Sequence, residues 1–132
     1  MPHINLLSVF LATIASFLLG GAWYSPALFK KTWQQQAGLD DAALAGRNMG
    51  QVFAGSFLLT LVASAVFALF IGPGRNTVFG AAAGLAAGLC WVAASFGINY
   101  LFERRSLVLF LINGGYHTVQ FTIMGAILGA MS

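Results

Sequence analysis

The segments Asn99–Ser106 (NYLFERRS) and Asn113–Gln120 (NGGYHTVQ) decide how the rest of the chain is interpreted. The first segment places one glutamate and two arginines between two long apolar stretches. The second places amide, hydroxyl and imidazole groups within an apolar stretch. Polar groups of this kind, surrounded by apolar sequence, are typical of the interior of a helical membrane bundle.

Charged residues are scarce and are grouped along the chain. Of the 132 residues, 59% are hydrophobic and 7% are charged, whereas about 25% of a typical soluble domain is charged. The charged groups separate four uncharged stretches of about 20 to 25 residues, each long enough to cross a bilayer core. The composition therefore predicts an all-α polytopic membrane protein with four transmembrane helices in a compact bundle.

The uncharged stretches give the expected limits of the helices within a single transmembrane domain, 1–132. The four spans are expected at about residues 4–24, 48–71, 77–101 and 106–131. The connector 25–47 is expected to contain a short amphipathic helix in the interface. Ser25 and Pro26 are suited to begin this helix, Gly38 to end it, and Asp40 to cap a second turn.

Aromatic and basic residues predict where the helices meet water and how they are oriented. Trp23, Tyr24 and Trp33 are expected to be interface anchors. The connectors 25–47 and 102–106 together carry five lysines and arginines, whereas the turn between the second and third spans carries only Arg75. Because positive charge favours the cytoplasmic side, both connectors are expected in the cytoplasm and both termini outside. This bias disfavours a flipped arrangement or a dual-topology dimer.

Glycines repeat at every fourth position in the third and fourth spans. Such stripes let two helix backbones approach closely, either within a chain or between copies of it. The predicted helix-packing glycines are Gly80, Gly84, Gly88, Gly125 and Gly129.

Polar side chains are expected to gather in the half of the bundle nearest the two basic connectors. Asn113, His117 and Gln120 share one helix face, and Tyr116 lies beside it. Unpaired amide or imidazole groups facing lipid would be costly, so these groups should face the interior and find partners there. The candidate members are Asn48, Gln51, Asn99, Tyr100, Asn113, Tyr116, His117 and Gln120.

Two interpretations of this polar cluster stay open: a hydrogen-bond network between helices, or a small cavity open to the cytoplasm. His117 is expected about 16 Å along its helix, near the middle of the hydrocarbon core. Gly114 and Gly115 fit either a close helix contact or a local break of the helix.

Several functional classes are disfavoured. The basic residues border apolar segments, as in membrane proteins, so no nucleic-acid partner is expected. One cysteine, Cys90, and one deep histidine supply too few ligands for a metal site, and no other cofactor is implied. The only carboxylates are Asp40, Asp41 and Glu103. No catalytic constellation is evident, and we expect no enzymatic activity.

Three motifs together resemble a known family. They are Trp23–Pro26 followed by Phe29 and Trp33, then Asn99–Arg105, then Asn113–His117. These motifs resemble small bacterial four-helix membrane proteins classified as a domain of unknown function, and the resemblance covers essentially the whole chain. It implies a compact four-span protein of the inner membrane, and it implies no activity or substrate.

Two functional hypotheses follow. In the first, the chain is an accessory or structural membrane protein that contacts the lipid bilayer and forms homo-oligomers or binds another membrane protein. In the second, it is a small homo-oligomeric transporter or channel with a cytoplasm-facing polar cavity around Asn113, Tyr116 and His117. No carboxylate is expected inside the membrane, so a transporter of this type would favour a neutral or anionic substrate.

Overall fold

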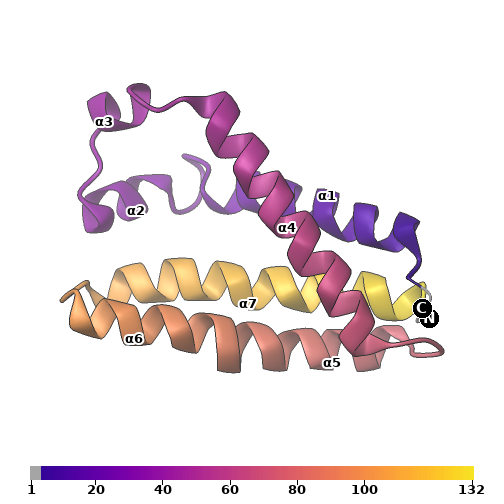
Figure 1. Cartoon of the computed structure of the whole chain (residues 1–132). Coiled ribbons are helices and arrows are strands. Elements are labelled where there is room, and N and C mark those ends of the chain that lie inside the picture. The colour runs from indigo at the N-terminus through magenta and orange to yellow at the C-terminus, as the bar shows by residue number, and fades with distance from the viewer. Residues whose placement is uncertain (1–3) are drawn as a thin grey trace.

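The computed structural model describes residues 4–132, in which all regular structure is helical (Figure 1). Four helical spans are long and apolar enough to cross a membrane, so the predicted all-α fold of a multi-pass membrane protein is confirmed. Their limits lie within about two residues of those expected. In chain order the elements are α1 (Leu6–Trp23), α2 (Lys30–Ala37), α3 (Asp41–Ala45), α4 (Met49–Ile71), α5 (Thr77–Ala87), the π-helical η1 (Gly88–Ala93), α6 (Ala94–Phe102) and α7 (Leu107–Ala130).

Each span begins with a polar side chain that accepts hydrogen bonds from the first helical turn. Without such caps, the first backbone N–H groups of a helix have no partner. The side chain of Asn48, for example, accepts from the backbone N–H of Gln51 at 3.1 Å. The capping residues of the four spans are Asn5, Asn48, Asn76 and Ser106.

Helix α7 is the central element and packs against α1, α4 and the continuous α5–η1–α6 span. Both ends of the described chain lie together with the turn between α4 and α5 (Figure 1). Asn5 Nδ2 donates to the Met131 carbonyl at 3.1 Å, and Arg75 N–H donates to Ser132 Oγ at 2.8 Å. We call this the termini end of the molecule. The opposite end, which carries α2, α3 and the turn between α6 and α7, is the connector end.

The tightest packing lies between α5 and α7, where glycine leaves no room for a side chain. A Cβ atom on Gly80 would collide with the Gly125 carbonyl oxygen, and one on Gly84 with the Phe121 carbonyl oxygen. Gly129 similarly lies against backbone at Asn76. The glycine stripes therefore pack helix against helix within one chain. Small residues of this kind let helix backbones approach closely in a membrane.

The π-helical segment η1 lets this contact continue past the glycine stripe. Gly88 packs on the backbone of His117 and Thr118, where a Cβ atom would lie 2.8 Å from each. The next residues of α5–η1–α6 to meet α7 are Ala93, beside Gly114, and Gly97, beside the ring of Phe110. The contact residues are thus four apart along the span, except between Gly88 and Ala93, which are five apart. One extra residue is what the wider π turn absorbs.

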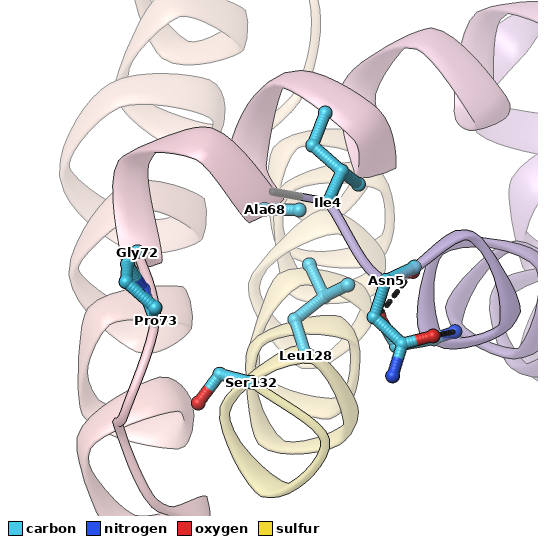
Figure 2. Close-up of a pocket in the computed structure, with 8 residues that line it drawn as sticks. Ile4, Asn5, Ala68, Gly72, Pro73, Leu128 and Ser132 are labelled. Atoms are coloured by element: carbon cyan, nitrogen blue, oxygen red, sulfur yellow. Dashed lines mark hydrogen bonds between the residues drawn. The ribbon is translucent and has the colours of Figure 1, made fainter. Parts of the chain in front are cut away.

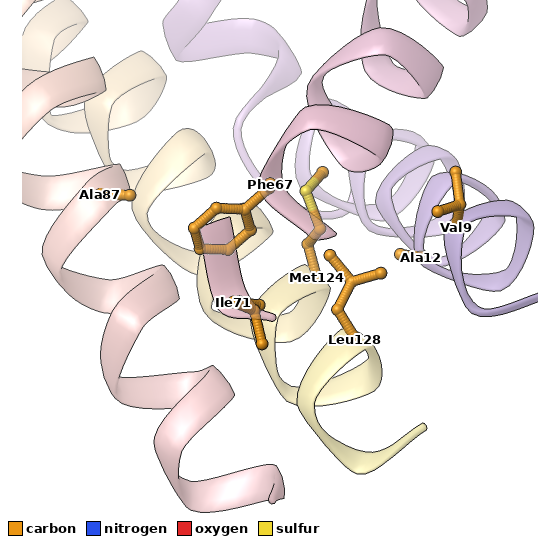
Figure 3. Packing of buried hydrophobic residues seen from close by; sticks show 7 residues of the cluster. All are labelled: Val9, Ala12, Phe67, Ile71, Ala87, Met124 and Leu128. Atoms are coloured by element: carbon orange, nitrogen blue, oxygen red, sulfur yellow. The ribbon is translucent and has the colours of Figure 1, made fainter. Parts of the chain in front are cut away.

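The hydrophobic core lies toward the termini end, between α1, α4 and α7 (Figure 3). Met124 and Leu128 of α7 are fully enclosed there. Helix α1 contributes Val9 and Ala12, α5 contributes Ala87, and α4 contributes Phe67 and Ile71.

Helix α4 joins the bundle over only part of its length. Its buried residues are Ser64, Phe67 and Ile71, and Ser64 Oγ donates to the Val9 carbonyl at 3.2 Å. By contrast, every residue of the stretch 49–56 is exposed. In Figure 1, α4 crosses the other spans obliquely, close to them at the termini end and apart from them near α3. The packing is therefore looser at the connector end.

The connector differs in one respect from expectation. Helix α2 begins at Lys30 and not at Pro26, because Ser25 folds back instead of capping forward: its Oγ donates to the Ala22 carbonyl at 2.7 Å. The chain forms a tight loop over residues 24–29, in which the Phe29 N–H donates to the Trp23 carbonyl at 3.1 Å and the Phe29 ring lies 5.0 Å from that of Trp23. Gly38 ends α2 with φ of 72°, and the Asp40 side chain caps α3, both as predicted.

Candidate functional site

Asn113 joins three spans through its side-chain amide. Its Oδ1 atom accepts a hydrogen bond from the Tyr24 hydroxyl at 2.6 Å. Its Nδ2 atom donates to the Tyr100 hydroxyl at 2.7 Å. Because Tyr24 follows α1, Tyr100 lies on α6 and Asn113 on α7, one side chain connects these three elements near the connector end. Interior amides in membrane bundles are stabilised by such partners.

Trp23 and Tyr116 extend these contacts between α1 and α7. The indole N–H of Trp23 donates to the Ile112 carbonyl at 3.0 Å, and the hydroxyl of Tyr116 donates to the Ser16 carbonyl at 3.1 Å. Glycines make both contacts possible. A Cβ atom on Gly115 would lie 3.2 Å from the Trp23 ring, and α7 runs unbroken through this position.

Aromatic rings pack beside these hydrogen bonds. The Tyr24 ring lies 5.5 Å from that of Tyr116 and 5.6 Å from that of Trp33. Trp23 and Tyr24, expected as interface anchors, are thus bonded into the bundle as well. Trp33 is held against Tyr24, so α2 is attached to the same cluster.

His117 is enclosed between two aromatic rings. The Phe96 ring is stacked on it at 5.1 Å and 15°, and the Tyr116 ring meets it edge-on at 4.9 Å. His117 Nδ1 lies 2.7 Å from Gln120 Oε1. Because a carbonyl oxygen only accepts, a hydrogen bond at this contact requires the tautomer that carries its proton on Nδ1. The imidazole is therefore held in one orientation by three neighbours.

A cavity of about 960 Å³ lies where α4 separates from α1 and α7. Helix α7 contributes Tyr116, His117 and Gln120 to its wall. The polar residues of α4 that line it are Ser56 and Thr60. Toward the connector end it is bordered by residues from α2, α3 and the loop that follows α3. Its volume is at the upper end of the range for sites that bind small molecules.

The predicted polar residues separate into three groups in the structure. Tyr116, His117 and Gln120 line the cavity. Asn113 and Tyr100 form the hydrogen-bonded network with Tyr24 and are not among the residues that line it. The remaining three residues, Asn48, Gln51 and Asn99, are exposed at the connector end. Asn48 serves there as the cap of α4.

Sequence reasoning missed several residues of the site. Ser56 and Thr60 are spaced four residues apart, so their shared helix face could have indicated a polar wall on α4. Phe96 lies four residues before Tyr100, and the pair meets His117 and Asn113, which are four residues apart on α7. That match carries no sequence signal until the two helices are known to be antiparallel neighbours.

A second, smaller hollow of about 310 Å³ lies at the termini end (Figure 2). Asn5, Leu128 and Ser132 are among the residues that line it. The amide of Asn5 bonds to Met131, and Ser132 Oγ bonds to both Arg75 and Gly129. These polar groups close the end of the bundle, so the larger cavity is the better candidate site.

Comparisons with known proteins add a family and no activity. No curated protein and no solved structure significantly matches the chain. One family model, described as "Protein of unknown function (DUF1761)", matches residues 7–129. Since this match covers nearly the whole chain, the protein belongs to the DUF1761 family of proteins of unknown function.

Proposed function

We propose that this protein binds a small molecule in the cavity between α4 and α7 and moves it into or across the membrane. One observation carries the proposal: Tyr116, His117 and Gln120, polar residues of a membrane span, line a cavity of about 960 Å³. A span that served only for packing would be expected to bury such groups against its neighbours. Asn113 bonds through both ends of its amide to neighbouring elements, whereas the His117 side chain bonds only within α7 and stays partly exposed at the cavity, as does Tyr116.

The proposal includes an orientation. We place the protein in a bacterial inner membrane with its connector end in the cytoplasm and both termini outside. The lysine and arginine bias supports this orientation, and the connectors 25–47 and 102–106 do lie at one end of the molecule. The cavity reaches Lys30 and Arg47 at that end. A ligand would therefore enter from the cytoplasmic side.

Cysteine labelling tests both the cavity and the orientation. In a Cys90→Ala background, Ser56→Cys places a thiol on the cavity wall. Leu58→Cys places a thiol outside the cavity, at an apolar position of α4 where the native leucine is 60% exposed. We expect a membrane-impermeant maleimide to label Ser56→Cys rapidly from the cytoplasmic side and to label Leu58→Cys slowly. Equal labelling of the two thiols, or labelling of Ser56→Cys from outside only, would contradict the proposal.

Transport itself is tested by flux into liposomes that contain the purified protein. Neutral and anionic solutes should show flux that exceeds that of empty liposomes and falls on His117→Ala, since His117 lines the cavity. Asn113→Ala serves as the comparison, because it disturbs the network without altering a lining side chain. Flux equal to that of empty liposomes for all solutes would reject the proposed movement of a solute across the membrane, and only the proposed binding would stand.

An accessory role is the second candidate. The basic residues Lys31, Arg104 and Arg105 are exposed at the connector end and do not line the cavity. They, and not the glycine stripes, would contact a second copy or another membrane protein, because the glycines are already packed within the chain. A single stoichiometric partner recovered with the wild type and lost with Arg104→Gln/Arg105→Gln would support this role. Recovery of the same partner with that variant would contradict it.

No catalytic role or cofactor forms part of either candidate. Asp40, Asp41 and Glu103, the three carboxylates, are all exposed near helix ends. Asp40 is engaged as the cap of α3.

A further inference from the structure

Apolar side chains of α4 and α1 form part of the lining of the cavity described above. Val52, Phe53 and Leu59 line it on α4, and Phe17 lines it on α1. The small hydroxyl side chains of Ser56 and Thr60 lie among them, and that of Thr60 donates within its own helix to the Ser56 carbonyl at 2.7 Å. The apolar α4 residues are all exposed, because this part of the helix leans away from its neighbours. At about 1.5 Å per residue, Leu59 lies about 15 Å along the helix from Met49. The apolar wall is therefore long enough to accompany an extended hydrocarbon chain from the connector end into the membrane.

Charged groups stand at the connector end of the same cavity. Lys30, Arg47 and Asp41 line it there, so cations outnumber carboxylates by two to one. The Asp41 carboxylate accepts a hydrogen bond from Gln34 Nε2 at 3.0 Å. The Arg47 Nε atom donates to the Leu44 carbonyl at 3.2 Å, which holds the guanidinium beside the opening. An anionic group can accept from the remaining N–H groups of Arg47 and from Lys30.

The two features follow one another from the connector end inward. In the proposed orientation, the cationic groups would lie at the level of the interface, and the apolar wall would continue from them into the hydrocarbon region. An amphiphile whose head group is anionic would match both parts at once. A volume of about 960 Å³ suits a ligand of drug-like size, and this favours a molecule with a single alkyl chain.

We propose that the ligand of this cavity is a single-chain anionic amphiphile, with its phosphate or carboxylate head group held by Lys30 and Arg47 and its chain lying along α4. This inference rests on the proposed function of the cavity and specifies the ligand class. Entry would occur from the cytoplasmic leaflet, at the end of the cavity that Lys30, Asp41 and Arg47 line. The aromatic side chain of Trp33, which also lines the cavity, would lie close to the bound head group.

The test uses the full chain in nanodiscs of zwitterionic lipid. The probe is dodecyl phosphate carrying bromine on carbon 2, next to the head group and therefore near Trp33, and the signal is quenching of tryptophan fluorescence. Dodecyltrimethylammonium with the same bromine reverses the head-group charge, and inorganic phosphate supplies the head group without a chain. Trp33→Phe identifies the part of the signal that comes from the cavity.

We expect saturable quenching by dodecyl phosphate, competition by unbrominated dodecyl phosphate, and little competition by inorganic phosphate. Lys30→Gln/Arg47→Gln should weaken binding about tenfold, since two partly exposed charge contacts are lost. Arg104→Gln/Arg105→Gln is the matched control: it removes two cations at the same end that do not line the cavity. Its binding should be unchanged within about twofold.

Each other outcome overturns the inference in a recognisable way. Equal or tighter binding of the ammonium amphiphile would reject the anionic ligand class while leaving the cavity function intact. Competition by inorganic phosphate at the same concentration as dodecyl phosphate would identify free phosphate, and not a lipid-like molecule, as the ligand. An equal loss in Arg104→Gln/Arg105→Gln and in Lys30→Gln/Arg47→Gln would show that surface charge alone attracts the probe. Absence of saturable quenching by either amphiphile, together with labelled Ser56→Cys, would reject this ligand class but not the cavity.

Discussion

The hydroxyl of Tyr24 donates a 2.6 Å hydrogen bond to Asn113 Oδ1, across a separation of 89 residues in the chain. The same amide donates to Tyr100, so one asparagine fixes the relative positions of α1, α6 and α7. Helix α4 takes no part in this network. The molecule therefore combines a rigid group of three spans with a fourth span that is anchored only toward the termini end.

Substitution of Asn113 should destabilise the protein. Asn113→Leu removes two side-chain hydrogen bonds, each worth about 0.6 to 2 kcal/mol between membrane helices. We expect the free energy of unfolding in mixed micelles to fall by about 1 to 4 kcal/mol. Asn99→Leu, at an exposed position of α6, should change it by less than about 0.5 kcal/mol. Equal effects of the two substitutions would contradict the role assigned to Asn113.

Addition of a methyl group between α5 and α7 should be poorly tolerated. In Gly84→Ala the new Cβ atom would collide with the Phe121 carbonyl oxygen, and backbone cannot move aside as a side chain can. Overpacking in a core costs about 1 to 3 kcal/mol, so the thermal midpoint should fall clearly. Gly55→Ala is the matched control, because a Cβ atom at that α4 position meets nothing within 4 Å. Equal thermal midpoints for Gly84→Ala and Gly55→Ala would show that α5 and α7 are not in this close contact in the membrane.

Deletion of one residue distinguishes η1 from an ordinary helical turn. Removal of Cys90 would convert the π turn to α-helix and keep the contact stripe through Gly84, Gly88, Ala93 and Gly97 in line. Removal of Ala82, also exposed, would rotate Gly80 out of the stripe. We expect the first variant to retain most of its thermal stability and the second to lose its cooperative transition. If deletion of Cys90 lowered the thermal stability more than deletion of Ala82, the π-helical turn η1 would not be where the span accommodates its additional residue.

The C-terminal end of α2 should depend on Gly38. Its φ of 72° lies in the left-handed region, where a side chain costs about 1 to 2 kcal/mol. Gly38→Ala should therefore loosen the connector that borders the cavity and speed tryptic cleavage after Lys31 and Arg47. Gly46→Ala, at φ of −75°, should leave the cleavage rate unchanged. Equal rates in the two variants would contradict the strain at Gly38.

Much of the fold could be predicted because its physical cause is local. Uncharged stretches of sufficient length define the spans, and the spacing of Gly80, Gly84 and Gly88 identifies a face that needs close contact. The expectation that Asn113 and its polar neighbours turn inward also follows from the cost of exposing them to lipid. Contacts that depend on which helices are neighbours, such as Phe96 on His117, have no such local cause.

The oblique course of α4 lies beyond sequence reasoning for a related reason. Helix α4 carries only a narrow stripe of small hydroxyl side chains, Ser56, Thr60 and Ser64, which does not fix the angle at which the helix crosses its neighbours. Only Ser64, bonded to Val9, and its neighbours Phe67 and Ile71 show which face turns inward. The cavity, and with it the distinction between lining residues and network residues, follows from that course. The sequence could therefore indicate the polar cluster but not its division.

The hydrogen bond from Asn5 to Met131 makes the bundle nearly circular in its connectivity. A brief peptide from residue 132 to residue 4 would close the described helices into a ring without displacing any of them. New ends could then be opened at the turn between α6 and α7 while the four crossings persist. The order in which the spans are synthesised could thus be changed without changing how they pack.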